Sequence, residues 1–394
     1  MLDHPSSGPA AIQTQFGAIF VSLELSRSNW VVTSLSPGKG ERMSRRGLDA
    51  GKFSDLQALF AELQRKGAEQ TGTVYPIITI QEAGLDGFWL HRMLEADGVE
   101  SHVVDAASIP APRRRRRAKT DKLDGEALLR ALLAFKRGEP RVCSMVAVPS
   151  VEEEDRRRLC REREALINER VRHTNRIRGL LCAQGIFDYK PLRRDRCKRL
   201  EELRTADGRP LPTHVKTQIS RELARLALLI EQIKAVEAEQ EAMLEAEMAA
   251  AKRTADPAKA EPPGRVAMLL AVKGISTQAA SILWTEGLSR QFANRRQLAA
   301  YAGLAATPWR SGAIVHEQGL SKAGNPRLRT LMVQLAWLWR RHQPDSELSK
   351  WFSKRDKRDR KGAIVALARK LLVALWKYVA HGVVIEGAVM KPAA

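Results

Sequence analysis

The sequence predicts a protein of the α/β plus α class, with a mixed sheet and helices in its N-terminal part, then a helical connector and an α-rich C-terminal part. Two observations support this prediction. Short apolar, β-branched runs alternate with helical patterns up to about residue 148, which is typical of α/β domains. Residues 151–200 then carry 15 basic and 9 acidic groups and few strand formers, as long charged helices do.

Shifts in composition indicate where the parts begin and end. With 394 residues, the chain has the length of two or three domains. We expect a disordered leader at 1–15, a sheet domain at 16–148, a helical connector at 149–251, a linker rich in Pro, Ala and charge at 252–264, and a C-terminal domain at 265–390.

The predicted sheet begins with a hairpin. Residues 17–35 hold two apolar runs separated by a polar stretch, which favours two antiparallel strands. Residues 74–82 are largely apolar, as in a central strand. The elements expected next are an amphipathic helix over 85–98, a strand over 100–108 and a helix over 121–135.

The connector contains a heptad seam. Apolar residues recur with 4,3,4,3 spacing and the pattern weakens afterwards. This seam predicts helix packing, either within the chain or across a dimer. Its members are Ile219, Leu223, Leu226, Ile230 and Ile233.

The C-terminal part is expected to contain helices and a glycine-rich loop. Residues 266–284 match a helix–hairpin–helix pattern, in which turn amides can face a phosphate. The glycine-rich loop lies within 310–331 and leads into a helix with Asn325 at its N-cap. Two helices over 348–382 flank a strongly basic linker at 353–362.

The net charge indicates a polyanionic partner. The chain has 66 Lys and Arg against 45 Asp and Glu, which gives +21 and a pI near 10.2. Such a surplus favours nucleic acid or a membrane surface. The sequence has no run of 18 apolar residues and no secretory signal, so we expect a cytoplasmic, nucleoid-associated protein with no membrane partner.

Its four cysteines form no CxxC pair, which predicts reduced thiols and no zinc.

Carboxylates are the first candidates for chemistry, because the sequence lacks the motifs of P-loop NTPases, Rossmann enzymes, zincins and serine hydrolases. Glu24 and Glu82 end predicted strands, and Asp121 and Asp124 lie three residues apart at a helix start. Acids that converge at the carboxyl edge of a sheet can hold Mg²⁺ for phosphoryl transfer. The alternative for Asp121 and Asp124 is a favourable interaction with the helix dipole. Glu82 is harder to explain that way, because a carboxylate after an apolar strand is costly unless paired, exposed or liganded.

Three motifs resemble a known family. They are 81–94 (QEAGLDGFWLHRML), 113–129 (RRRRRAKTDKLDGEALL) and 301–329 (YAGLAATPWRSGAIVHEQGLSKAGNPRLR). In this order they are similar to transposases of the insertion-sequence 110 family, from about residue 17 to 390. The resemblance implies an N-terminal RuvC-like (RNase H-like) domain with an Asp–Glu–Asp–Asp metal cluster, a helical connector and a C-terminal transposase domain with a nucleophilic serine. It also implies a recombinase guided by a bridge RNA that the element encodes.

Position by position, the resemblance makes Glu82, Asp121 and Asp124 the second, third and fourth acids of the cluster. The first acid is an aspartate in the family, where this chain has Glu24 in SLELSR. Glutamate keeps the charge but is one methylene longer, and Mg²⁺ tolerates displaced ligands poorly. Glu24 therefore either ligates with a shifted carboxylate or weakens this copy, and Asp105 is the alternative first acid.

The candidate nucleophile is Ser311, which follows Arg310 in an expected loop and so has a cation beside it to neutralise phosphate charge. The tripeptide alone is a weak signal, and the resemblance selects it. Ser321, beside Lys322, is the rival. Neither serine has a histidine at an obvious spacing, so activation would come from metal, arginine or substrate.

Basic residues near these positions are candidate nucleic-acid contacts. A run of like charges is ordinarily a solvated block. Beside a metal site on a protein of net charge +21, it favours phosphate contact and a salt-dependent affinity instead. The candidates are Arg113, Arg114, Arg115, Arg116, Arg117, Lys119, Arg310, Lys322 and Arg327.

The sequence therefore predicts a DNA recombinase that acts on element ends and target DNA. A serine ester conserves the energy of the phosphodiester, which agrees with the missing P-loop. The resemblance adds the bridge RNA and a homo-oligomer, a dimer or tetramer. Two other interpretations stay open: a metal-dependent, structure-selective nuclease without a covalent step, and a nucleic-acid-binding protein that has lost activity at Glu24.

Overall fold

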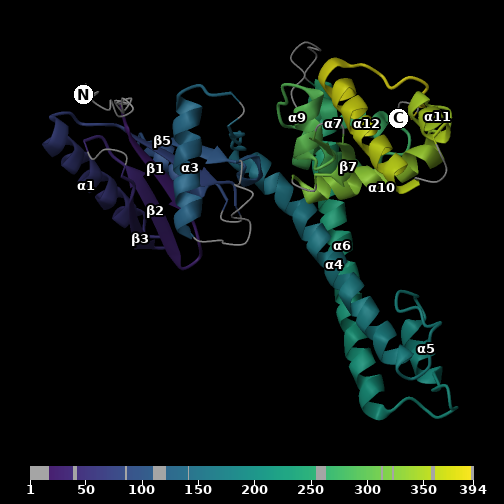
Figure 1. Cartoon of the computed structure of the whole chain (residues 1–394). Coiled ribbons are helices and arrows are strands. Elements are labelled where there is room, and N and C mark those ends of the chain that lie inside the picture. The colour runs from purple at the N-terminus through teal and green to yellow at the C-terminus, as the bar shows by residue number, and fades with distance from the viewer. Residues whose placement is uncertain are drawn as a thin grey trace. The chain divides into compact units, whose positions relative to one another are not determined.

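The computed structural model describes residues 17–38, 42–84, 87–109, 121–140, 142–253, 263–311, 314–321, 324–355 and 360–391. The expected leader at 1–15, most of the linker at 252–264 and the basic run Arg113–Arg117 lie outside these residues. The chain divides into two compact units, Met1–Val148 and Pro149–Ala394, which are described one at a time. The labels of helices and strands follow Figure 1.

Unit 1 is built on a mixed five-stranded sheet with the strand order β3-β2-β1-β4-β5. β1, β2 and β3 pair antiparallel, whereas β1, β4 and β5 pair in parallel. The mixed sheet and its first hairpin, both predicted from the sequence, are thus confirmed. The strands are β1 (Ile19–Glu24), β2 (Asn29–Leu35), β3 (Ser44–Asp49), β4 (Ile77–Glu82) and β5 (Glu100–Val104).

Helices cover both faces of this sheet (Figure 1). α1 (Phe53–Thr71) and α2 (Trp89–Ala96) pack on one face, where they bury the odd-numbered residues of β1. α3 (Asp121–Lys136) packs on the other face, where Phe20 of β1 joins its core. Alternate residues of β1 thus face opposite layers, as the two-residue period of a strand requires. A short 3₁₀ turn, Ala106–Ser108, follows β5.

Unit 1 contains two elements that the sequence did not predict, the edge strand β3 and the helix α1. All but one of the residues of β3 are exposed and two are arginines, so the strand lacks the apolar alternation on which strand prediction depends. The predicted helix over 85–98 is shorter in the structure, because α2 begins at Trp89. The predicted strand over 100–108 ends at Val104 and passes into the 3₁₀ turn.

Unit 2 begins with two long helices that lie side by side, α4 (Val151–Cys182) and α6 (Thr213–Arg253) (Figure 1). Ser150 caps α4 through a reciprocal pair of hydrogen bonds with Glu153, each 3.1 Å long. α5 (Arg196–Glu202) packs near the end of this pair and shares its core. The heptad seam therefore packs within the chain, against α4.

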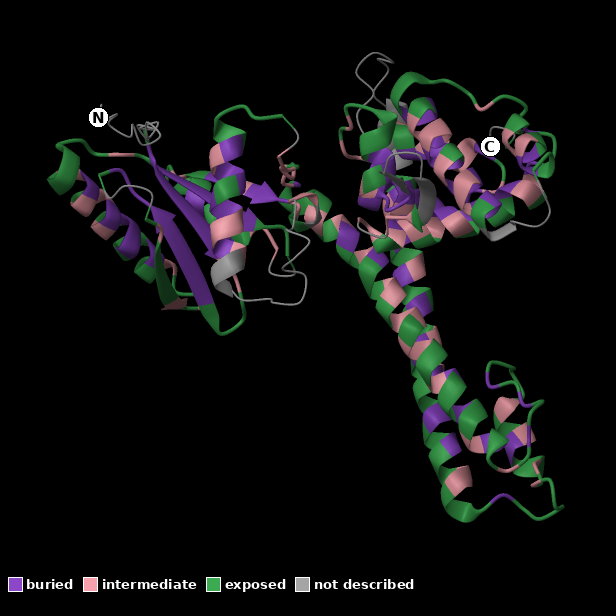
Figure 2. Ribbon diagram, viewed as in Figure 1, coloured by how far each residue is buried: buried purple, intermediate pink, exposed green. Residues whose placement is uncertain are grey.

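The seam differs in two respects from its prediction. Leu229 is buried where Ile230 is only half-buried, and burial continues beyond Ile233 to Leu244. The continuation follows from packing, because the last turns of α6 lie against α7 and α8 as well as α4. Figure 2 shows buried positions that recur along both long helices, between intermediate and exposed ones.

The rest of unit 2 forms a second hydrophobic core around α10 and α12. The predicted pair of helices at 266–284 is present as α7 and α8, and Gly274 between them has a φ of 93°. The elements are α7 (Pro263–Ala271), α8 (Thr277–Leu283), the π-helical turn η4 (Trp284–Leu288), α9 (Arg295–Tyr301), β6 (Ala306–Ser311), β7 (Ile314–Leu320), α10 (Pro326–His342), α11 (Glu347–Ser353) and α12 (Arg360–His381).

The prediction of a glycine-rich loop within 310–331 is wrong for most of that range. This segment contributes to a two-stranded antiparallel hairpin, β6 and β7. The strand residues 306–311 and 314–320 include Thr, Trp, Ile and Val, whose strand preference outweighs the scattered glycines. Among the described residues of both units, no helix has the length and apolarity needed to cross a membrane.

Candidate active site

Glu24 and Glu82 lie next to each other at the carboxyl edge of the sheet in unit 1. β1 and β4 pair in parallel with Leu23 opposite Gln81, so the residue after each of these also lies side by side. Leu23 faces α1 and α2, which places Glu24 and Glu82 on the face that α3 covers. Glu24 is half-buried and Glu82 is exposed.

Gly125 brings α3 into direct contact with this edge. Ser22 donates a hydrogen bond of 2.9 Å from its hydroxyl to the carbonyl oxygen of Gly125. A Cβ atom at position 125 would lie only 2.6 Å from Oε1 of Glu24 and 2.5 Å from the hydroxyl of Thr33. The helix can approach the strand this closely because residue 125 has no side chain. Asp124, in the first turn of the helix, directly precedes Gly125, the residue that approaches Glu24.

Asp121 and Asp105 complete the set of acids at this edge. Asp121 is the first residue of α3, but its side chain lies outside the described part of the chain. Asp105 follows Val104, the last residue of β5, whose side chain packs in the core on the α3 face. The alternation along a strand points the next residue to the opposite face. Glu24 is thus better placed than Asp105 to share a site with α3.

The donor atoms of these acids are of the kind that a hard divalent cation binds. All are carboxylates, the ligands that Mg²⁺ and similar ions prefer, and Oε1 of Glu24 is fully enclosed. Among the side chains that the structure describes, no three His, Cys, Asp or Glu lie close enough to hold a metal ion. Glu24, Glu82 and Asp124 are among these described side chains, so the structure does not bring the three together as a metal site, and their joint role stays a prediction.

The two candidate serines lie at opposite ends of the hairpin in unit 2. Ser311 is the last residue of β6 and pairs with Ile314, the first residue of β7. Ser321 follows β7, and its amide donates a hydrogen bond of 2.9 Å to the carbonyl of Ala305. Ser311 is therefore a strand residue beside the turn, not the loop residue that the sequence predicts. The side chains of Ser311 and Arg310 lie outside the described part of the structure, as do Lys119 and Lys322.

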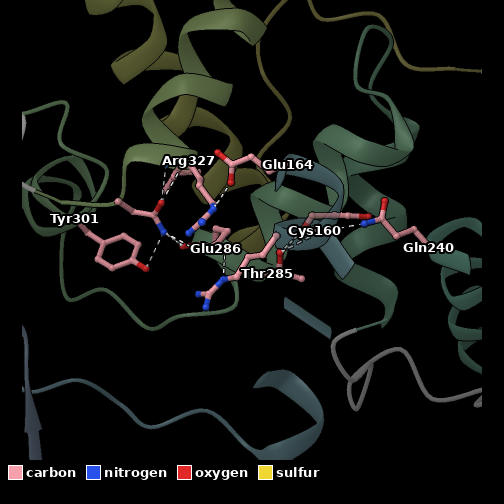
Figure 3. A network of polar contacts seen from close by, with 11 residues as sticks. Cys160, Glu164, Gln240, Thr285, Glu286, Tyr301 and Arg327 are labelled. Atoms are coloured by element: carbon pink, nitrogen blue, oxygen red, sulfur yellow. Dashed lines mark hydrogen bonds and ion pairs between the residues drawn. The ribbon is translucent and has the colours of Figure 1, made fainter. Parts of the chain in front are cut away.

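A polar network joins the start of α10 to other helices of unit 2 (Figure 3). Asn325 caps α10, as predicted, because its Oδ1 accepts hydrogen bonds from the amides of Arg327 (3.0 Å) and Leu328 (3.1 Å). Its Nδ2 donates to Oε2 of Glu286 at 2.8 Å. Glu286 lies in the π-helical turn and its side chain is 4% exposed. Asn325 thus holds both the helix terminus and a buried carboxylate.

α4 contributes two further ion pairs to this network. Arg161 donates from Nε to Oε1 of Glu286 at 3.3 Å, and Arg327 pairs with Glu164. Arg327, a predicted nucleic-acid contact, thus has an internal partner for its charge. Sequence reasoning missed Glu286 and Arg161, which lie 125 residues apart. The available signal was a glutamate within the apolar stretch ILWTEGL, where burial of a charge requires a partner.

The four cysteines are divided between the two units, with Cys143 in unit 1 and the other three in unit 2. All four are free. Cys160 is buried beside Gln240 and Thr285 (Figure 3), and burial raises the pKa of its thiol. A buried thiol with a raised pKa stays protonated and unreactive at neutral pH.

Comparison with known proteins decides the family. A family model described as "Transposase IS116/IS110/IS902 family" matches residues 266–349, and a model of DEDD transposases of the IS110 type matches residues 42–185. The chain is 65% identical over 388 residues to "Putative transposase y4rJ" of Sinorhizobium fredii, and the match covers 97% of each protein. The chain belongs to the IS110 family of transposases.

A more distant relative of this transposase is the "Transposase for insertion sequence element IS1328" of Yersinia enterocolitica. It is 29% identical over 57% of this chain and 63% of its own length. The DEDD match starts at residue 42, so it includes Glu82, Asp121 and Asp124 but not Glu24. The second match includes the hairpin, Glu286 and Asn325.

Proposed function

We propose that this transposase cuts and rejoins DNA through a covalent serine intermediate, with the sheet-edge acids assisting through Mg²⁺. In this proposal unit 1 has a RuvC-like fold and the DNA substrates are the element ends and the target. The observation that carries it is the close packing of Gly125 on Glu24. This contact joins the acid that departs from the family pattern to the helix that bears Asp121 and Asp124.

Glu24, Glu82, Asp121 and Asp124 would hold the metal. A divalent ion bound by these acids would neutralise charge on phosphate oxygens during the transfer. The carboxylates orient the ion, and the Ser22 hydroxyl fixes α3 by its hydrogen bond to Gly125. Without a metal, the clustered negative charges would repel one another.

The covalent step uses Ser311. Its Oγ forms a bond to phosphorus, the bond from phosphorus to one sugar oxygen breaks, and the proton of the serine leaves with the freed sugar hydroxyl. The reverse reaction with another hydroxyl restores a phosphodiester, so no ATP is consumed. Ser311 pairs with Ile314 at the end of the two-stranded element where β6 passes into β7, which supports its assignment as a nucleophile at the end of the hairpin.

A bridge RNA is the proposed guide, and a homo-oligomer the proposed assembly. The support is the net charge of +21, which favours the binding of polyanions in general. In such a complex the protein mainly contacts backbone phosphates and duplex shape, while base pairing selects the sequence. The arginines at 113–117 with Lys119, Arg310 and Lys322 are the proposed contacts.

The test is Ser311→Ala against the matched control Ser321→Ala, with Mg²⁺ and element-end DNA. We expect Ser311→Ala to abolish strand transfer and the covalent protein–DNA adduct, with nucleic-acid affinity changed by no more than a few-fold. An adduct that persists in Ser311→Ala but disappears in Ser321→Ala would reassign the nucleophile. Cleavage without any adduct would favour the metal-dependent nuclease, and no cleavage at all would favour a binding protein. Sequencing the RNA that copurifies with the wild type tests the guide.

A further inference from the structure

Two arginines in unit 2 have no anionic partner among the side chains that the structure describes. Arg157, in α4, is 6% exposed, and no described side chain forms a hydrogen bond or an ion pair with it. Arg290 follows the π-helical turn, and its Nε is buried without a hydrogen-bond partner among the described residues. Burying a guanidinium costs free energy unless an anion compensates its charge.

The groups around these arginines do not supply that anion. The guanidinium of Arg290 lies over the ring of Tyr301, 4.9 Å from its centroid, which is a cation–π contact. The hydroxyl of Tyr301 accepts from Asn325 at 3.4 Å. Glu286 is the nearby carboxylate, and both its oxygens are occupied, by Arg161 and by Asn325 (Figure 3).

Charge is therefore in excess at this place. Arg157 and Arg161 lie one helical turn apart on the same side of α4, so Arg157 lies beside the network that Arg161 joins. Burial lowers the pKa of the Arg157 guanidinium, and the charge of Arg290 lowers it further, while Tyr301 and Glu286 act in the opposite sense. Among the side chains that the structure describes here, three arginines face one carboxylate, which leaves two positive charges for an external anion.

We propose that Arg157 and Arg290, with Arg161 at the rim, bind a backbone phosphate of nucleic acid. The planar guanidinium donates paired hydrogen bonds that match phosphate oxygens, and it is less strongly hydrated than an ammonium group. Tyr301 and Asn325 border this arginine site without adding negative charge. The inference rests on the proposed function, because it assigns one contact of the nucleic acid that unit 2 would bind.

The phosphate bound by these arginines is a different one from the phosphate that Ser311 attacks. Tyr301 ends α9, and the hairpin that follows runs from Ala306 to the turn beside Ser311. A strand of this length spans about 17 Å at 3.4 Å per residue. The phosphate bound at the base of the hairpin therefore fixes the register of the nucleic acid, while another phosphate meets Ser311.

The first test compares Arg157→Gln with Arg158→Gln in the full-length protein. Arg158 is exposed and adjacent, so its variant loses the same charge without touching the site. Binding is measured with labelled element-end DNA and with an RNA hairpin at several NaCl concentrations. We expect Arg157→Gln to weaken binding about 10-fold and to lower the log–log salt slope by about 1, and the control to change neither by as much. If Arg157→Gln weakens binding to only one of the two nucleic acids, that nucleic acid is the source of the phosphate.

The second test measures melting temperature without nucleic acid, in wild type, Arg157→Met and Arg290→Met. Removing an uncompensated buried charge should leave the melting temperature unchanged or raise it. Inorganic phosphate should raise the melting temperature of the wild type more than that of either variant. A fall in melting temperature with unchanged binding would mean that Arg157 has an internal partner, and would overturn the inference. A wild type that binds neither DNA nor RNA would refute the proposed function instead, and the phosphate response would still decide the arginine site.

Discussion

The acid edge of unit 1 and the polar network of unit 2 are assembled in different ways. At the acid edge, the order of the strands brings the residues together. β1 and β4 are parallel neighbours, and Glu24 and Glu82 are the last residues of these strands, so they lie side by side. In the network of unit 2, Arg161, Glu286 and Asn325 come from three helical segments and meet only through tertiary packing. Residues at strand ends can therefore be predicted from a pattern, whereas residues at a helix junction cannot.

The largest effect should come from removing acids at the sheet edge. We expect Glu82→Ala and Asp124→Ala each to reduce Mg²⁺-dependent cleavage to background, a greater loss than the roughly 10–100-fold caused by losing an outer-shell partner. Without metal the fold should hold, since removing one of several clustered acids relieves repulsion. Cleavage against Mg²⁺ concentration and the melting temperature of the apoprotein are the two measurements. A large drop in melting temperature for both variants would mean that the acids stabilise the fold. The acid edge of unit 1 would then be a structural feature, as the polar network of unit 2 is.

The same contrast explains how much the sequence predicted. The mixed sheet, the first hairpin, α3 and the Asn325 cap follow from local patterns of period two, of period 3.6 and of capping residues. The strand β3 was missed because its exposed, charged residues follow no apolar alternation. The β6–β7 hairpin was missed because its glycines indicated a loop. Gly125 was not singled out, because its importance depends on Glu24, which is 101 positions away in the sequence.

In unit 2, the next largest effect should come from Glu286→Ala. The change removes the acceptor of both Arg161 and Asn325, and leaves the half-exposed guanidinium of Arg161 and the half-buried amide of Asn325 without that partner. We expect a loss of about 2–3 kcal/mol in unfolding free energy, at the low end for a broken buried pair because the Arg161 side chain is 48% exposed. Denaturant unfolding measures it.

Glu286→Gln is the matched control for that loss. An amide keeps the length and one acceptor, so Asn325 can still donate to it, and the cost should be clearly smaller. Equal losses for the two variants would show that charge, and not the hydrogen bond to the cap, dominates the network.

A smaller effect is expected from Gly125→Ala in unit 1. A Cβ 2.5–2.6 Å from Thr33 and Glu24 forces α3 away from β1, and overpacking of this kind costs about 1–3 kcal/mol. That cost outweighs the gain of up to about 1 kcal/mol that alanine brings to a helix. Gly179→Ala in α4 of unit 2 is the control, because nothing lies within 4 Å of its Cβ, and it should stabilise instead. Two changes of the same sign in thermal unfolding would contradict the tight contact at position 125.

The smallest and most informative effect concerns Glu24→Asp. The resemblance to the family implies an aspartate at this position, and the glutamate of this chain places its carboxylate against Gly125. We expect Glu24→Asp to keep the fold and either to raise cleavage a few-fold or to lower the Mg²⁺ requirement, because a shorter ligand loses less rotamer entropy when fixed. Glu24→Gln should lose activity, since it keeps the length and removes the charge. If aspartate is worse than glutamate, the backbone has adapted to the longer acid. If all three behave alike, position 24 is not a ligand and Asp105 becomes the first acid to test.

The contact at Gly125 allows this last prediction to be sharpened by a double-mutant cycle. In the Glu24→Asp background the carboxylate withdraws from the helix, so Gly125→Ala should cost less stability than it does in the wild type. Part of the cost must remain, because the hydroxyl of Thr33 still lies 2.5 Å from the new Cβ. A coupling energy near zero in thermal unfolding would mean that Glu24 does not pack on α3. The acids of strand and helix would then be brought together only by the metal, and the edge of unit 1 would resemble the helix junction of unit 2 in depending on more than strand order.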